Sequence, residues 1–244
     1  AEVAEPIELL RAGMVFHARG LINTRVIQHN LDWVWPYWID QQFDPESPAF
    51  LPRAFSITHV NLTHRNWTAV GRPDCAALPI VDPRGLVTAL DDGWSMDAWL
   101  LGDDGTALYP ARAATATQTI EGGDEDLVVV TGSAAGGLAL ESRARVTREG
   151  ERHYLVVEYR ASSEVGAKLV LALRPYNPEG ISFIRRLREA AGGEGGWRWQ
   201  VTDDEPGSAP VTIEFDHRPD ASAASDYARG DVALAVTRGE ATAP

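Results

Sequence analysis

An alternation of apolar and polar side chains dominates the second half of the chain. From Leu138 to Thr147, apolar or small residues alternate with polar or charged ones. A period of two is typical of a β-strand with one buried face and one solvated face. Val211–Asp216 repeats this pattern. Further strands are predicted over Leu127–Thr131, His153–Arg160, Lys168–Arg174 and Trp197–Val201.

Turn residues connect several of the predicted strands. Gly102-Asp103-Asp104-Gly105 separates the apolar stretches Asp97–Leu101 and Thr106–Tyr109, which predicts a β-hairpin. Glu149-Gly150-Glu151 predicts a second hairpin. Many strands at short spacing, with few helical patterns between them, favour antiparallel sheets packed face to face. The expected fold is therefore all-β, a large two-sheet antiparallel sandwich with few short helices.

The first 54 residues have a different character. Pro6–Phe16 has apolar residues at mixed helical spacing, which indicates a short helix or an irregular arm. Four large aromatic residues fall within Trp33–Trp38, and Pro36 prevents an uninterrupted helix there. We therefore divide the chain into an aromatic-rich N-terminal arm, residues 1–54, that packs on a sandwich domain, residues 55–244.

Charge and cysteine content exclude several classes of partner. The 244-residue chain has a formal net charge of −13, so it should repel nucleic acids and anionic membrane surfaces. It contains no apolar run long enough to span a bilayer. Its single cysteine, Cys75, cannot form an internal disulfide, which favours a reducing compartment. We expect a cytoplasmic protein that binds neither nucleic acid nor membrane.

The sequence offers no recognisable metal or cofactor site. His59 and His64 have no acidic or cysteine ligand at a standard spacing around them. The acidic pairs Asp91-Asp92 and Asp103-Asp104 lack the ligand spacing of a calcium loop. The glycine-rich stretches lack the strand–helix context of a dinucleotide-binding loop. No metal and no cofactor are expected.

Two aromatic or proline-rich segments are the candidate binding residues. The chain has eight tryptophans, and those of the arm either stack on sugar rings or fill a core or domain interface. Residues Leu171–Gly180 form a strand followed by a proline-stiffened segment, either a structural turn or a functional loop. The candidates for carbohydrate binding or a domain interface are Trp33, Trp35, Trp38, Arg174, Tyr176 and Asn177. We expect several of Trp35, Trp38, Tyr176 and Asn177 to be partly exposed and close together on one side of the sandwich.

Four segments carry a resemblance to a known family. His29–Pro36, Asn61–Trp67, Leu78–Gly85 and Leu173–Gly180 resemble the N-terminal region of bacterial glycogen-debranching or amylo-α-1,6-glucosidase-like proteins. The resemblance covers nearly the whole chain. In such enzymes a large antiparallel supersandwich, a mutarotase-like fold, precedes an (α/α)6 barrel that holds the catalytic carboxylates. It implies a non-catalytic domain whose partner is that C-terminal (α/α)6 catalytic domain, with α-glucan as a further contact.

Two alternatives remain open at the level of the sequence. In mutarotase-like carbohydrate epimerases the sandwich itself is the enzyme, with a histidine and a glutamate as general acid and base. Here His153 with Glu158 or Glu214 would be the candidates, although their spacing does not single them out. The second alternative is a free-standing sugar-binding module.

Overall fold

The computed structural model describes residues 68–90, 93–123, 127–177, 180–181, 184–203, 210–225 and 232–241. These residues form fifteen strands, two short 3-10 helices at Pro110–Arg112 (η2) and Gly193–Gly195 (η3), and one short α-helix, α4, at Val232–Thr237. The prediction of an all-β, sandwich-like fold is confirmed. The arm, residues 1–54, lies outside the described residues.

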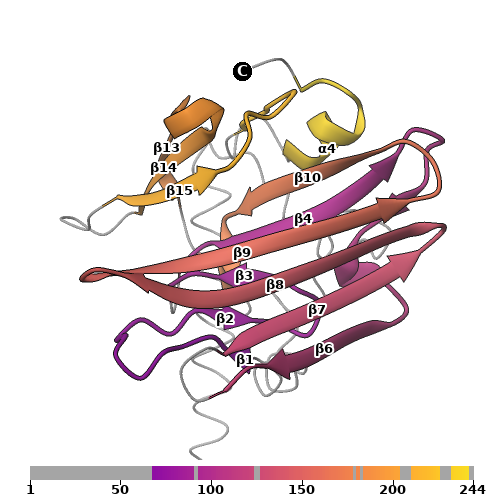
Figure 1. Cartoon of the computed structure of the whole chain (residues 1–244). Coiled ribbons are helices and arrows are strands. Elements are labelled where there is room, and N and C mark those ends of the chain that lie inside the picture. Colours follow the sequence, from indigo (N-terminus) through magenta and orange to yellow (C-terminus); the bar gives the residue numbers. More distant parts are fainter. Residues whose placement is uncertain are drawn as a thin grey trace, which may run out of the picture.

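The first two sheets are antiparallel and form a sandwich (Figure 1). One has six strands in the order β1-β2-β3-β4-β10, with β5 paired to β4. The other has four strands in the order β6-β7-β8-β9. The strands of the first sheet are β1 (Thr68–Ala69), β2 (Ile80–Val81), β3 (Val87–Thr88), β4 (Ser95–Gly102), β5 (Ala107–Leu108) and β10 (Ala167–Arg174). Those of the second are β6 (Ala116–Glu121), β7 (Val128–Ala135), β8 (Leu138–Glu149) and β9 (Arg152–Ser163).

The core lies between these two sheets. One cluster joins the β1–β3 region to β7 and β8, and a second joins β4 and β5 to β8. The strict alternation along β8 buries every second side chain from Leu138 to Val146, as the sequence pattern predicts. The first cluster consists of Val70, Val81, Val87, Val129, Ala144 and Val146. The second consists of Ala98, Leu100, Leu108, Ala113, Leu138 and Leu140.

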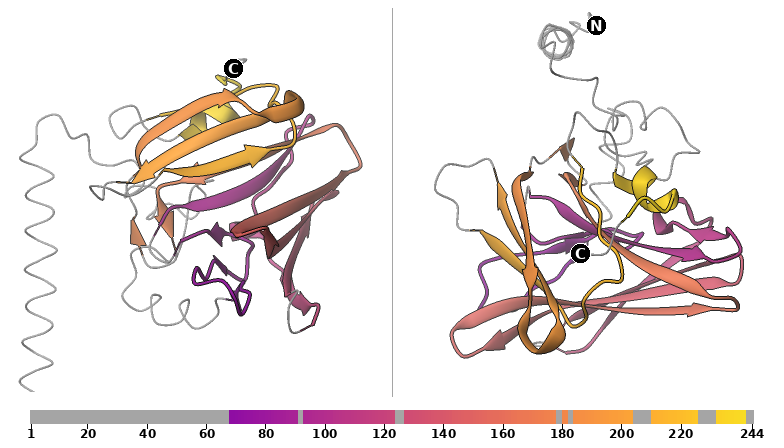
Figure 2. Two further views of the ribbon diagram at one scale, coloured as in Figure 1. Left: turned by 60° about the vertical axis from the view of Figure 1, so that its left-hand side comes forward. Right: turned by 90° about the horizontal axis from the view of Figure 1, so that it is seen from above.

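A third sheet lies over the side of β4 and β10 that faces away from the four-stranded sheet (Figure 2). It consists of β13 (Ile184–Ala191), β14 (Trp197–Asp203) and β15 (Val211–Phe215). A two-stranded ladder of β11 (Tyr176–Asn177) and β12 (Gly180–Ile181) precedes it in the chain. The six-stranded sheet is thus a middle layer, a feature that the sequence pattern does not predict.

Both predicted hairpins are confirmed. Strands β4 and β5 pair through Leu100 and Leu108 around the Gly102–Gly105 turn, and β8 pairs with β9 along its whole length. Gly105 takes a φ of 88°, a conformation that favours glycine. Among the described residues, no helix has the length and apolar character needed to cross a membrane.

Candidate functional site

Strand β4 presents different chemistry on its two faces. Met96, Ala98 and Leu100 pack against the four-stranded sheet, so the odd-numbered Ser95, Asp97 and Trp99 project from the opposite face. The register of the β4–β10 pair places Arg174 opposite Ser95 and Ala172 opposite Asp97. Residues directly opposite one another project to the same side of a sheet. We call this side, toward the third sheet, the outer face.

Two arginines and two aromatic rings form a row on the outer face. The Arg174 guanidinium carbon lies 5.5 Å from the centroid of the Trp99 ring. The Tyr109 ring meets Trp99 edge to face at 5.6 Å, and Arg112 lies 5.6 Å from the Tyr109 centroid. We call Arg112, Tyr109, Trp99 and Arg174 the arginine–aromatic row.

Trp99 and Arg174 are the buried members of the row, while Tyr109 and Arg112 are partly exposed. Trp99 and Arg174 are each only 1% exposed. The Trp99 indole Nε1 donates to Asp97 Oδ2 at 2.9 Å, and the buried guanidinium of Arg174 gains about 2 kcal/mol from a desolvated aromatic face. Burial raises the pKa of Tyr109, although the charge of Arg112 opposes that rise. Because Trp99 has no exposed face, it cannot stack on a sugar ring from solvent.

Asn177 is fixed in the interior. Its Nδ2 donates to the carbonyl oxygen of Gly93 at 2.8 Å, and the residue is 4% exposed. Asn177 is therefore not one of the partly exposed residues that the sequence led us to expect, because its amide joins β11 to the segment that leads into β4. The backbone of Tyr176 belongs to β11. The side chain of Tyr176, together with Trp33, Trp35 and Trp38, lies outside the described residues.

Arg174 and Asn177 both contact residues 93–99, Arg174 through the Trp99 ring and Asn177 through the carbonyl of Gly93. Sequence reasoning identified these two residues but missed Asp97, Tyr109 and Arg112. The one local signal for Asp97 is its position two residues before Trp99 in a predicted strand, which places both on one face. Tyr109 and Arg112 join the row only through the fold, since they follow β5.

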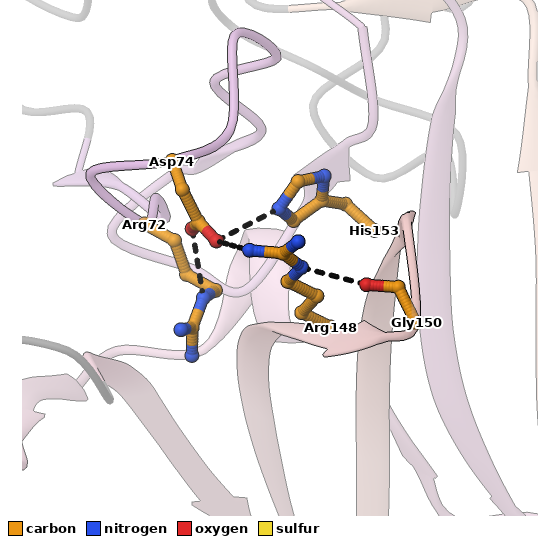
Figure 3. A network of polar contacts seen from close by, with 5 residues as sticks. All are labelled: Arg72, Asp74, Arg148, Gly150 and His153. Carbon is orange, nitrogen blue, oxygen red and sulfur yellow. Dashed lines mark hydrogen bonds and ion pairs between the residues drawn. The ribbon is translucent and has the colours of Figure 1, made fainter.

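A second polar cluster lies at the end of the β8–β9 hairpin (Figure 3). Asp74 Oδ1 accepts from Arg72 Nε at 3.1 Å, and Asp74 Oδ2 accepts from Arg148 Nη1 at 2.9 Å. His153 Nε2 lies 3.4 Å from the same Oδ2, which is long for a hydrogen bond. The hydrogen bond from Arg72, with further contributions from Arg148 and His153, holds the pKa of Asp74 well below its usual range. The cluster ties the β1–β2 connection to the hairpin.

The candidate acid–base pair of a mutarotase does not assemble around β9. His153 and Glu158 are five residues apart in this strand, so their side chains project from opposite faces. Glu158 forms an ion pair with Arg145 at 2.5 Å. Glu214 belongs to β15 in the third sheet and pairs with Arg198 at 2.9 Å.

The cavities differ in size and character. A cavity of about 10 Å³ lies within the sandwich beside Gly85, Ser133 and Tyr159. A shallow depression of about 490 Å³ lies at the β7–β8 turn and the end of β9, where small residues such as Ala135 and Gly136 line it. In the part of the chain that the structure describes, no group of three or more His, Cys, Asp or Glu side chains could hold a metal ion.

Comparison with protein-family models, curated proteins and solved structures finds no match for this chain. The chemistry of the row must therefore be interpreted from its own geometry. Both of its aromatic rings are in contact with a guanidinium group, and one arginine and one tryptophan are almost fully buried.

Proposed function

We propose that this chain is the non-catalytic N-terminal domain of a cytoplasmic, glycogen-debranching-like glycoside hydrolase. In this role it supports an (α/α)6 catalytic domain and contacts α-glucan. The resemblance of four segments to such proteins suggests the role, and the all-β sandwich is compatible with it. The geometry around His153, Glu158 and Glu214 gives no comparable support to a mutarotase-like epimerase.

One observation carries this proposal, namely the anchoring of the segment from Arg174 to Asn177. Arg174 ends β10 beneath the Trp99 ring, and Asn177 is bound to the carbonyl of Gly93. A segment held at both ends loses little further conformational freedom when a partner binds to it. Arg174 and Asn177 thus hold this segment in place from the interior of the protein. In this proposal, neighbouring exposed side chains make the contact with the catalytic domain.

The sugar contact, by contrast, needs an accessible aromatic ring. Trp99 is excluded from this role by its burial. Trp33, Trp35 and Trp38 remain the proposed sugar-contacting residues, because flat indole rings with polar neighbours suit the C–H faces of glucose.

Three measurements on the whole chain test this function. We expect maltoheptaose to release or absorb heat on binding in isothermal titration calorimetry. We also expect no glucose release from glycogen limit dextrin and no acceleration of glucose mutarotation. Trp35→Ala should weaken the binding at least several-fold, whereas Tyr154→Ala, at an exposed aromatic of β9, should not change it.

The opposite results identify the competing functions. Mutarotation accelerated by the chain and lost in His153→Ala would establish the epimerase. Glucose release that is lost when one carboxylate of this chain is replaced would establish a complete hydrolase. If Trp35→Ala and Tyr154→Ala weaken the binding of maltoheptaose equally, the arm does not form the sugar-binding site.

A further inference from the structure

A line of polar side chains crosses the core between the six-stranded and four-stranded sheets. Thr68 Oγ1 donates to Gln118 Oε1 at 2.6 Å, and Gln118 Nε2 donates to Thr131 Oγ1 at 3.1 Å. Gln118 Nε2 also lies 2.8 Å from the backbone oxygen of Asp82. The strand register continues the line, because Thr131 is opposite Ser142, and Ser142 is opposite Tyr159. We call this line the polar seam.

The turn that faces the seam is itself fixed by hydrogen bonds. Asp82 Oδ1 accepts from the backbone nitrogens of Arg84 at 2.6 Å and Leu86 at 3.3 Å. The Arg84 guanidinium donates to the backbone oxygens of Pro110 and Ala113. This turn ends the segment Leu78–Gly85, so its polar residues serve to hold the backbone beside the seam.

Two buried hydroxyl groups beside the polar seam, one on β7 and one on β9, lack a hydrogen-bond partner among the described residues. The Tyr159 hydroxyl and Ser133 Oγ are buried, and within the described part of the chain neither has a hydrogen-bond partner. Burial, with a contribution from the negative charge of Asp97, raises the pKa of Tyr159. Its hydroxyl therefore stays protonated and can both donate and accept. A buried hydroxyl without a partner lowers stability, so such groups normally bind protein or water.

A small cavity lies at the place where these two hydroxyls occur. Its volume is about 10 Å³, and its lining includes Ser133, Ser142 and Tyr159 on one side and Arg84 and Gly85 on the other. A volume of roughly 10–15 Å³ is the least that holds one water molecule, and a hydrated cavity offers two to four polar partners. Apolar cavities stay dry, but this lining includes four hydroxyl-bearing residues, namely Thr131, Ser133, Ser142 and Tyr159.

We propose that this cavity binds one structural water molecule between the hydroxyls of Tyr159 and Ser133, which completes the polar seam. Ser142 supplies a third hydroxyl at the same cavity. The water joins β7 and β9 of the four-stranded sheet beside the Arg84–Gly85 turn of the six-stranded sheet. A fully satisfied polar network of this kind specifies one alignment of the two sheets, because any other alignment leaves buried groups unpaired.

The sign of a stability change tests the proposal. If a water bridges the hydroxyls, Tyr159→Phe and Ser133→Ala each remove one of its partners and should lower the melting temperature by about 2–4 °C. The losses should not add in the double variant, because both act through one shared molecule. Tyr154→Phe alters the same strand at a 41% exposed ring and should leave the melting temperature unchanged.

A dry cavity gives the opposite result. Tyr159→Phe would then remove an unsatisfied buried hydroxyl and raise the melting temperature, which overturns the proposal. A crystal structure of the unaltered chain gives the direct readout, with water density about 2.7–3.2 Å from both hydroxyl oxygens as the expected result. A map that resolves other internal waters but no density in this cavity also overturns it.

Discussion

Buried polar side chains on the outer face of β4 hold the strands of the middle layer in register. Thr88 Oγ1 and Ser95 Oγ share a hydrogen bond at 2.8 Å, next to the indole of Trp99 that donates to Asp97. Asn177 adds the bond to the carbonyl of Gly93. Each of these contacts satisfies a group whose burial would otherwise cost stability.

Asn177→Ala should lower the free energy of unfolding by about 1–3 kcal/mol, because it removes a buried donor and leaves the Gly93 carbonyl without that bond. Urea denaturation measures this loss. Thr212→Ala, at an exposed position of β15, serves as the control and should change stability by less than about 0.5 kcal/mol. A loss for Asn177→Ala as small as that of the control would show that the anchor contributes little.

Gly85→Ala and Gly105→Ala should each cost about 1–2 kcal/mol of stability, because both glycines have a φ of 88° that a Cβ atom disfavours. The space around them differs. A Cβ at Gly85 would meet Ser142 Oγ at 3.4 Å, whereas at Gly105 it would meet nothing within 4 Å. Similar losses in urea denaturation would show that backbone conformation dominates at both positions. A much larger loss for Gly85→Ala would instead identify crowding against the polar seam.

At the scale of elements, the Asp74 cluster fastens an irregular connection to a long hairpin. The connection between β1 and β2 contains Arg72 and Asp74, while Arg148 and His153 belong to β8 and β9. Arg148 Nε also donates to the carbonyl oxygen of Gly150 in the hairpin turn, at 2.7 Å. The same arginine therefore holds both the turn and the connection.

Asp74→Asn should destabilise the protein at neutral pH but not in strong acid. The native state lowers the pKa of Asp74 from its usual 3.8, chiefly through Arg72. The carboxylate thus contributes stability that is fully present above pH 3.8 and is lost as the pH falls through the lower native value. Urea midpoints of the two proteins should differ at pH 7 and converge below that window.

The control for this titration is Glu149→Gln, an exposed position at the same hairpin. It should shift the urea midpoint little at either pH. A gap between Asp74→Asn and the unaltered chain that widens with acid would contradict the assignment of Asp74 as a stabilising carboxylate.

The sequence predicted elements more successfully than it predicted their assembly. Alternation located β8 and turn residues located both hairpins, because strands and tight turns depend on local chemistry. The pairing partner of β10, by contrast, could not be predicted in this way. Strand β10 follows β9 after a short turn, yet it pairs with β4 in the other sheet, with Leu171 opposite Ala98. This pairing joins residues that are 65 to 79 positions apart, from Ala167 with Gly102 to Arg174 with Ser95, so no local pattern specifies it.

In the candidate site, too, the local sequence indicates some residues, whereas the contacts of these residues depend on the fold. The proline-rich segment marked Arg174 and Asn177 as notable, because stiff polar turns follow from the sequence itself. Their burial depends on contacts with Trp99 and Gly93, which lie more than seventy positions earlier in the chain, so no local signature reveals it. For the same reason Tyr109 and Arg112 could not be associated with Trp99 before the fold was known.

At the scale of the whole molecule, the central strand β4 of the middle layer is buried on both faces. Strand β4 has hydrogen-bonded neighbours on both edges, with β3 and β5 on one and β10 on the other. Four consecutive residues, Asp97–Leu100, are buried although they alternate between the two faces. By contrast, β6 pairs only with β7 among the described strands and is mostly exposed.

This layering predicts the order in which amide hydrogens exchange with solvent. Exchange from a stable core requires global opening, whereas an exposed edge strand opens locally at a smaller free energy. The backbone amides of β4 and of the Leu138–Val146 part of β8 should therefore exchange slowest, and those of the exposed edge strands β6 and β13 fastest among the longer strands. Hydrogen–deuterium exchange with mass spectrometry of the whole chain measures this order. Protection of β6 equal to that of β4 would contradict it, because two sheets of such different burial would then be opening as a single unit.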